Sequence, residues 1–512
     1  MKKIMIFISS FFMLFILSAC LENNEPIIDM TLYEEVVQHI DARLPIHINN
    51  DFLLPTHPLA EITWELEGQS FDEIFIYESP FFDRTVDLIA HITIDGTTES
   101  RHFPVLLAAR DSALSVSQIY ITMSIPVHDI SRTEYNDVEV RIESDINGQT
   151  FEIFHTDEAR IRGRGNSTWW MPKKPYRLRF NEEVSILGLP KARDYVLLAE
   201  YADKSLLRNT IVHKFSSLLG TFDHTIQTRV VELYINGHYE GLYVLTEQVE
   251  MREEKLYFES IPGVLDTGYF FELDRRFYER GIVEGFDWIV VAGVPYEIIR
   301  PNPSHQDYTA QHAEFLRQYI IDMETALIRQ EGYEDYLDID NWIDYFIIQE
   351  LFKNVDVGWS SVYSYKLPGG RIKMGPLWDF DLAIGNADYI DYGPENWYGM
   401  REHKNRWFKL MMAIPEVRDR FKDRYIEIYM NYIPELLESI WVMHEAKAPL
   451  AQRNFNRWAI LNHYVWPNPP EMVQATTYEA QVSYVYHFIR ERADWMLSAV
   501  QSEAFEQGIF DE

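Results

Sequence analysis

The segment Gly375-Pro376-Leu377-Trp378-Asp379-Phe380-Asp381-Leu382 is the most informative stretch of this chain. Its alternation predicts a strand that turns Asp379 and Asp381 to one side and apolar residues to the other. Two neighbouring carboxylates make an oxygen-rich site, which suits Mg²⁺ or Mn²⁺ when phosphate oxygens complete the coordination. The segment therefore predicts a metal site, against the alternative of a solvated face on an edge strand.

A third carboxylate, Asp356, lies upstream of this pair. Residues 340–353 have apolar side chains at helical spacing, so we expect a helix there, with Asp356 in the loop that follows. Residues 362–374, with Gly369-Gly370 at the turn, then predict a hairpin that leads to Asp379. Protein kinases place their catalytic and metal-binding aspartates in this order of helix, loop acid, hairpin and second acid. Alone, Asp356 would be read as an acid at a helix end; its position relative to the pair makes it the candidate catalytic residue.

A glycine-containing segment carries the candidate phosphate ligands. Residues 162–169 read Arg-Gly-Arg-Gly-Asn-Ser-Thr-Trp, and an alternating run of basic and apolar residues follows. The alternation places Lys174 on the apolar side of a strand, and Lys173 and Arg177 on the other side. An inward lysine needs a partner, because burying an unpaired ammonium group is costly, and in kinases the partner is a nucleotide phosphate. Lys174 is therefore the first candidate and Arg177 the second; the alternative is that Pro175 breaks the strand and leaves Lys174 at the surface.

A hairpin is predicted by residues 230–245, which have Asn236-Gly237 at the turn. Its second strand ends in Glu247 and Gln248, after a run of apolar residues. We expect these two residues at the hinge, where polar groups would meet a nucleotide base.

The N-terminus indicates export and lipid attachment. Lys2 and Lys3 precede an apolar run that ends in Leu-Ser-Ala before Cys20, the only cysteine of the chain. This resembles a bacterial lipoprotein signal peptide in residues 1–19, and its removal would leave Cys20 as the lipidated first residue. The alternative is an ordinary signal peptide that contains a cysteine. The expected location is the cell membrane, with the protein anchored in the lipid bilayer through Cys20 on the extracytoplasmic side.

The remaining chain predicts an α+β protein. Residues 20–55 are expected to form a tether, 56–124 a small all-β, sandwich-like module, 125–400 the core with the motifs above, and 401–512 a helical region. The net charge of −34 argues against binding to nucleic acid or to a bare anionic lipid surface.

Taken together, several stretches resemble the spore coat protein H (CotH) kinase family. They run in family order over about residues 125–400 and read IRGRGNSTW, KKPYRLRF, ADKSLLRN, VELYINGHYEGLYVLTEQVE, GYFFELD, and DVGWSSVYSYK followed by GPLWDFDLAIGN. The resemblance implies an atypical, shortened protein-kinase-like core. It further implies that the γ-phosphate of ATP is transferred, with Mg²⁺ or Mn²⁺, to serine or threonine of a spore-coat or cell-surface protein. Asp356 would then be the catalytic aspartate and Asp379 the metal ligand, with Asp381 as a second ligand.

One departure concerns Ser361, which stands where protein kinases have the asparagine that holds a second metal. A catalytically weak pseudokinase that acts as a surface binding or adhesion protein is therefore one alternative, and the scarcity of ATP outside the cytoplasm favours it. A metal-dependent glycosyltransferase is another, because Asp-x-Asp also holds a metal and a sugar nucleotide. Against it, a nucleotide-sugar fold requires strands and helices to alternate before Asp379, and the sequence does not show this alternation.

Overall fold

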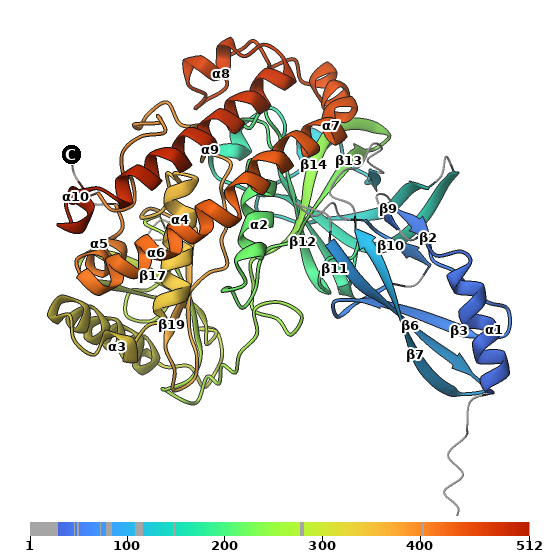
Figure 1. Ribbon diagram of the computed structural model, residues 1–512, viewed down its shortest axis with the longest axis horizontal. Helices are drawn as coiled ribbons and strands as arrows, with labels where there is room; N and C mark the ends of the chain where they lie inside the picture. The colour runs from blue at the N-terminus through green and yellow to red at the C-terminus, as the bar shows by residue number, and fades with distance from the viewer. Residues whose placement is uncertain are drawn as a thin grey trace, which may run out of the picture.

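The computed structural model describes residues 29–45, 47–48, 51–71, 73–77, 84–107, 116–146, 149–276, 281–401 and 404–510. The predicted signal peptide and Cys20 lie outside the described residues. Figure 1 shows a blue N-terminal module, a group of strands at the centre, and a region rich in helices that ends at the C-terminus. Among the described residues, no helix is long and apolar enough to cross a membrane.

The N-terminal module is a five-stranded sheet in the order β1-β7-β6-β3-β4, with helix α1 packed against it. A two-stranded sheet, β2-β5, shares its core. The predicted tether of residues 20–55 includes α1, whose side chains Val36 and Ile40 are buried in this core because they share one face of the helix. The bounds are α1 Met30–Asp41, β1 His47–Ile48, β2 Phe52–Leu53, β3 Glu61–Leu66, β4 Gln69–Phe71, β5 Ile74–Phe75, β6 Arg84–Ile94 and β7 Thr97–Leu107.

A closed barrel of seven strands follows, in the order β10-β11-β12-β14-β13-β8-β9. Strand β8 pairs parallel with β13, so the segment 119–123 belongs to the barrel and not to the N-terminal module in which we predicted it. The pairing was invisible in the sequence because the two strands are far apart along the chain. The bounds are β8 Ser117–Thr122, β9 Asn136–Ile146, β10 Gln149–Gly163, β11 Tyr176–Val184, β12 Ala192–Leu198, β13 Thr228–Ile235 and β14 His238–Glu247.

A second five-stranded sheet, in the order β16-β17-β15-β18-β19, is antiparallel throughout and leads to the paired aspartates. Helix α2 lies between the barrel strands β12 and β13 in the chain and packs against α4 and α7, and α3 and α4 pack beside the sheet. The bounds are α2 Arg208–Leu219, β15 Tyr269–Leu273, β16 Trp288–Val291, β17 Val294–Arg300, α3 Ala310–Arg329, α4 Ile339–Leu351, β18 Val362–Lys366 and β19 Ile372–Met374.

The C-terminal region is helical, as predicted. The long helices α7 and α9 pack side by side, and α7 also contacts strand β14 of the barrel (Figure 1). The bounds are α5 Arg406–Met412, α6 Pro415–Asn431, α7 Ile433–Arg457, α8 Pro470–Gln474, α9 Tyr478–Val500 and α10 Glu503–Glu506.

The predicted strand over residues 375–382 does not form, because β19 ends at Met374 and the aspartates lie in a loop. Asp379 has a left-handed backbone with φ of 69°. Its apolar neighbours are buried in different places: Phe380 lies in the main core, whereas Trp378 packs in a separate cluster that includes Phe270 and Tyr365 of the second sheet. A straight strand could not send these two side chains to different cores, so the loop replaces it.

Candidate active site

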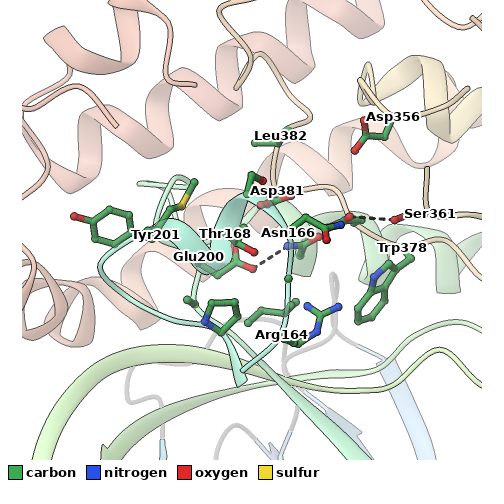
Figure 2. Close-up of a pocket in the computed structure, with 18 of the residues that line it drawn as sticks. Arg164, Asn166, Thr168, Glu200, Tyr201, Asp356, Ser361, Trp378, Asp381 and Leu382 are labelled. Carbon is green, nitrogen blue, oxygen red and sulfur yellow. Dashed lines mark hydrogen bonds between the residues drawn. The ribbon is translucent and has the colours of Figure 1, made fainter. Parts of the chain in front are cut away.

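A cavity of about 320 Å³ lies between the barrel and the helical half. The residues of its barrel wall are Arg164–Thr168, Met171, Lys173, Pro175, Leu198–Tyr201 and Gln248, and those of its helix wall are Asp356, Ser361, Trp378, Asp379, Asp381 and Leu382. Side chains of the second sheet, including Asp274 and Arg276, complete the lining. In Figure 2, Asp356 and Ser361 lie at one end of the cavity and Tyr201 at the other.

All three carboxylates of the sequence prediction line this cavity. Asp356 follows α4 in a tight loop, in which its backbone N–H donates to Asn354 Oδ1 at 3.0 Å and its carbonyl accepts from Trp359 N–H at 2.9 Å. Burial and the neighbouring charge of Asp379 raise the pKa of Asp356 to about 7. A carboxyl group that titrates near neutral pH is suited to accept a proton.

Asp379 and Asp381 form the acidic centre of the helix wall. Ser361 Oγ donates to Asp379 Oδ2 at 3.1 Å, which is drawn as a dashed line in Figure 2. Burial, followed by the charges of Asp379 and Glu200, raises the pKa of Asp381 well above its usual range. The carboxylates are therefore crowded, which is the environment that a cation relieves. Within the described part of the chain, no group of three or more His, Cys, Asp or Glu side chains has the arrangement of a metal site.

The lysine that lines the cavity is Lys173, and not Lys174. Lys173 is 2% exposed, and its Nζ donates to the carbonyl of Leu242 and to Asn454 Oδ1 at 2.9 Å. Burial lowers its pKa to about 7. Lys174 instead donates to the carbonyl of Trp169 at 2.5 Å and does not line the cavity.

The predicted orientations of the two lysines are wrong because strand β11 begins only at Tyr176, after Pro175. Burial alternates as predicted from Tyr176 to Phe180, but the alternation does not extend back through Pro175, which has no N–H to donate to a ladder of hydrogen bonds.

Of the other three residues predicted to contact the nucleotide, only one lines the cavity. Arg177 Nε donates to Asp194 Oδ1 at 2.9 Å and does not line the cavity. Glu247 is fully buried and accepts from His224 Nε2 at 2.9 Å, also away from the cavity. Gln248, the next residue, does line it. Neighbouring residues at a strand end point in opposite directions, so only one of this pair can reach the cavity.

The family model of the CotH kinase protein matches residues 161–496, which is more than half of the chain. This chain belongs to the CotH kinase family. A curated relative, inner spore coat protein H of Bacillus subtilis (strain 168), is 32% identical over 114 residues. That alignment covers 22% of this chain and 29% of the relative.

The CotH kinase match begins near the end of β10 and ends within α9, so the N-terminal module and strands β8 and β9 precede it. Family membership implies a kinase-like core. The cavity, with Asp356, Asp379 and Asp381, lies wholly within the matched residues.

The CotH kinase core also contains cavity residues that our sequence analysis did not select. Arg164 lies over the ring of Trp378 at 5.6 Å, and burial lowers its pKa while Asp379 raises it. Glu200 is 7% exposed and accepts from Asn209 Nδ2 at 2.8 Å. Burial, followed by the charge of Asp203, raises the pKa of Glu200 to about 8. Asn209 lies in ADKSLLRN, one of the stretches that resemble the family, but the local sequence pattern there does not indicate that it lines a cavity.

Proposed function

We propose that this protein is a metal-dependent protein kinase that transfers the γ-phosphate of ATP to serine or threonine. The observation that carries the proposal is the meeting of Asp356, Asp379 and Asp381 in one cavity, opposite the cationic side chains of the barrel wall. Phosphoryl transfer depends mainly on positioning and on neutralising charge, which this combination of groups supplies.

Asp379 and Asp381 are the residues that would hold the metal ion. When bound, Mg²⁺ or Mn²⁺ supplies positive charge that neutralises the nucleotide phosphates. The crowding that raises the pKa of Asp381 supports a cation there. Magnesium is commonly held by one or two carboxylates together with substrate phosphates, so a site of only two protein ligands fits this chemistry.

Asp356 is the proposed catalytic residue, because its carboxyl group titrates near pH 7 and lines the same cavity. It would accept or orient the proton of the substrate hydroxyl group. On the barrel wall, Arg164 and Lys173 are the basic side chains that line the cavity and would contact phosphate groups, and Gln248 is the predicted hinge residue that remains a candidate for contact with the base.

The protein substrate and the location are proposals from the sequence and the family. Cys20 would anchor the chain in the lipid bilayer, so the substrate would lie on the extracytoplasmic side of the cell membrane. The named relative is a spore coat protein, which supports a spore-coat or cell-surface protein as the substrate.

The test is incubation of the detergent-purified chain with γ-labelled ATP, Mg²⁺ or Mn²⁺, and an extract of coat or surface proteins. We expect labelled serine or threonine with the wild-type chain and a loss of at least about a thousandfold with Asp356→Asn. Asp335→Asn is the matched control, because Asp335 is exposed and outside the cavity. Equal labelling by Asp356→Asn and wild type would contradict the assignment.

A catalytically weak, nucleotide-binding pseudokinase is the second candidate, and one observation favours it. Ser361, at the position of the kinase asparagine, already donates its hydroxyl group to Asp379. In the same assay this candidate predicts ATP binding without labelled product. No observation favours the glycosyltransferase, since the second sheet that leads to Asp379 is antiparallel and not doubly wound.

A further inference from the structure

The end of the segment after β12 and the first turn of α2 contact the loop of Asp379 and Asp381, although the two regions are far apart in the sequence. Residues 202–213 are buried without interruption, including the charged side chains Asp203 and Arg208. Buried charged residues are rare unless they are paired, so this segment has a specific structural role.

Asn209 bridges the two walls of the cavity with a single amide group. Its Oδ1 accepts from the backbone N–H of Phe380 at 2.8 Å, between the two aspartates. Its Nδ2 donates to Glu200 Oε1 at 2.8 Å on the barrel wall. The amide group therefore fixes the peptide group that joins Asp379 to Phe380.

Arg208 holds the same loop further along. Its Nε donates to the carbonyl of Ala383 at 2.9 Å, and its Nη2 donates to that of Ile384 at 3.1 Å. Asp203 balances its charge through a direct ion pair and also accepts from the backbone N–H of Leu207 at 3.0 Å. This pair is fully buried, so it is not weakened by solvent as a surface pair would be.

The loop needs such support because its backbone is strained. Asp379 has a φ of 69°, and Ile384 has a φ of 54°, which is rare for a β-branched residue. Strained conformations persist only where the surrounding structure over-determines them. Asn386 adds a third support by donating to the carbonyl of Asp381 at 2.8 Å.

We propose that Asn209 and Arg208 are positioning residues for the loop of Asp379 and Asp381. They hold its backbone so that both carboxylates face one cation and the nucleotide phosphates. This inference rests on the proposed function for its catalytic consequence, but the geometry that it assigns to the loop can be tested by metal binding alone. Neither side chain is assigned a contact with substrate.

The test measures binding of Tb³⁺, a luminescent ion that is excited through nearby tryptophan and that carboxylates bind. Trp378 is adjacent to Asp379, so an ion at this loop should give sensitised emission that Asp379→Ala loses. Asn209→Leu removes both amide hydrogen bonds at similar volume. We expect it to weaken this Tb³⁺ binding at least about tenfold, and to reduce kcat with KM for the protein substrate unchanged.

The matched control is Gln481→Leu, which removes another fully buried amide, one that donates to the carbonyls of Met472 and Ala475 at 2.5 and 2.6 Å. It should lower the melting temperature as Asn209→Leu does while leaving Tb³⁺ binding unchanged. Arg208→Lys is the second variant, since lysine keeps the charge beside Asp203 but lacks the fork that reaches two carbonyls. We expect it to weaken Tb³⁺ binding as well. If Asn209→Leu does not fold, Arg208→Lys alone tests the inference.

Wild-type Tb³⁺ affinity in folded Asn209→Leu or Arg208→Lys would overturn the inference, and so would emission that survives in Asp379→Ala. Weakened Tb³⁺ binding in both variants supports it even if no variant, nor the wild type, transfers phosphate. That last result would contradict the proposed function alone, so the two failures can be told apart.

Discussion

The two walls of the cavity differ in charge and in the way that the chain builds them. The helix wall carries three carboxyl groups, Asp356, Asp379 and Asp381, whereas the barrel wall carries the basic side chains Arg164 and Lys173. Glu200 is the exception on the barrel wall, and its raised pKa of about 8 leaves it largely protonated at neutral pH. A cavity with opposite charges on facing walls can bind a metal ion on one side and phosphate groups on the other.

The two walls therefore have different roles in the proposed reaction. The helix wall holds the groups proposed to act on the metal and the acceptor proton, so its loss should abolish transfer. The barrel wall holds groups proposed to surround the phosphates and the base, so its loss should weaken nucleotide binding by smaller factors.

The two walls should differ most in how much activity is lost when one residue of each is replaced by alanine, Asp379 on the helix wall and Gln248 on the barrel wall. Asp379→Ala should reduce metal-dependent phosphate transfer by at least about a thousandfold, because it removes a proposed metal ligand. Gln248→Ala should raise KM for ATP by no more than about tenfold, as expected for loss of a single hydrogen bond to a ligand. Steady-state kinetics with labelled ATP measure both. A larger loss from Gln248→Ala than from Asp379→Ala would reverse the roles of the walls.

A smaller effect distinguishes the two adjacent lysines of the barrel wall. Lys173→Met should weaken nucleotide binding by about tenfold, because it removes a cation from the cavity, whereas Lys174→Met should change it less than about twofold. Calorimetric titration with ATP and Mg²⁺ measures each affinity. If Lys174→Met is the variant that loses affinity, the assignment from alternation was right and the one from the cavity is wrong.

The smallest expected effect is a dependence of stability on pH. Asp356 has a pKa of about 7 in the folded chain against an ordinary value of 3.8, so the folded state binds more protons between these values. The wild type should therefore lose stability as pH rises from about 4 to 7, and Asp356→Asn should not. Without metal, the melting temperature of Asp356→Asn relative to wild type should rise by about 2–4 °C between pH 5 and pH 8. An unchanged difference would mean that the pKa of Asp356 is not raised.

The same division between the walls explains what could be predicted from the sequence. The acidic residues of the helix wall lie in two loops, one after helix α4 and one after the β18–β19 hairpin that follows it in the chain, so their proximity followed from local patterns. The strand predicted for Asp379 and Asp381 was wrong, yet both residues line the cavity, because the short loop after β19 still directs them there.

The positions of the side chains on the barrel wall depend on contacts between segments that are distant in the sequence, so a local sequence pattern cannot predict them. Lys174 was selected by extending an alternation through Pro175, and the hydrogen bond of Lys173 to Asn454 of α7 could not be anticipated. Glu247 was selected as a strand end, but its partner His224 precedes the hairpin and draws it away from the cavity. The parallel pairing of β8 with β13 was missed for the same reason.

A metal–nucleotide site between the two walls can be tested by thermal melting of the detergent-purified chain with ATP, with and without Mg²⁺ or Mn²⁺. A ligand that binds only the folded state raises the melting temperature by mass action. We predict a rise that requires ATP and metal together, that disappears in Asp379→Ala, and that persists in Asp356→Asn. No rise with any combination, or an equal rise in Asp379→Ala, would contradict a metal–nucleotide site between the two walls.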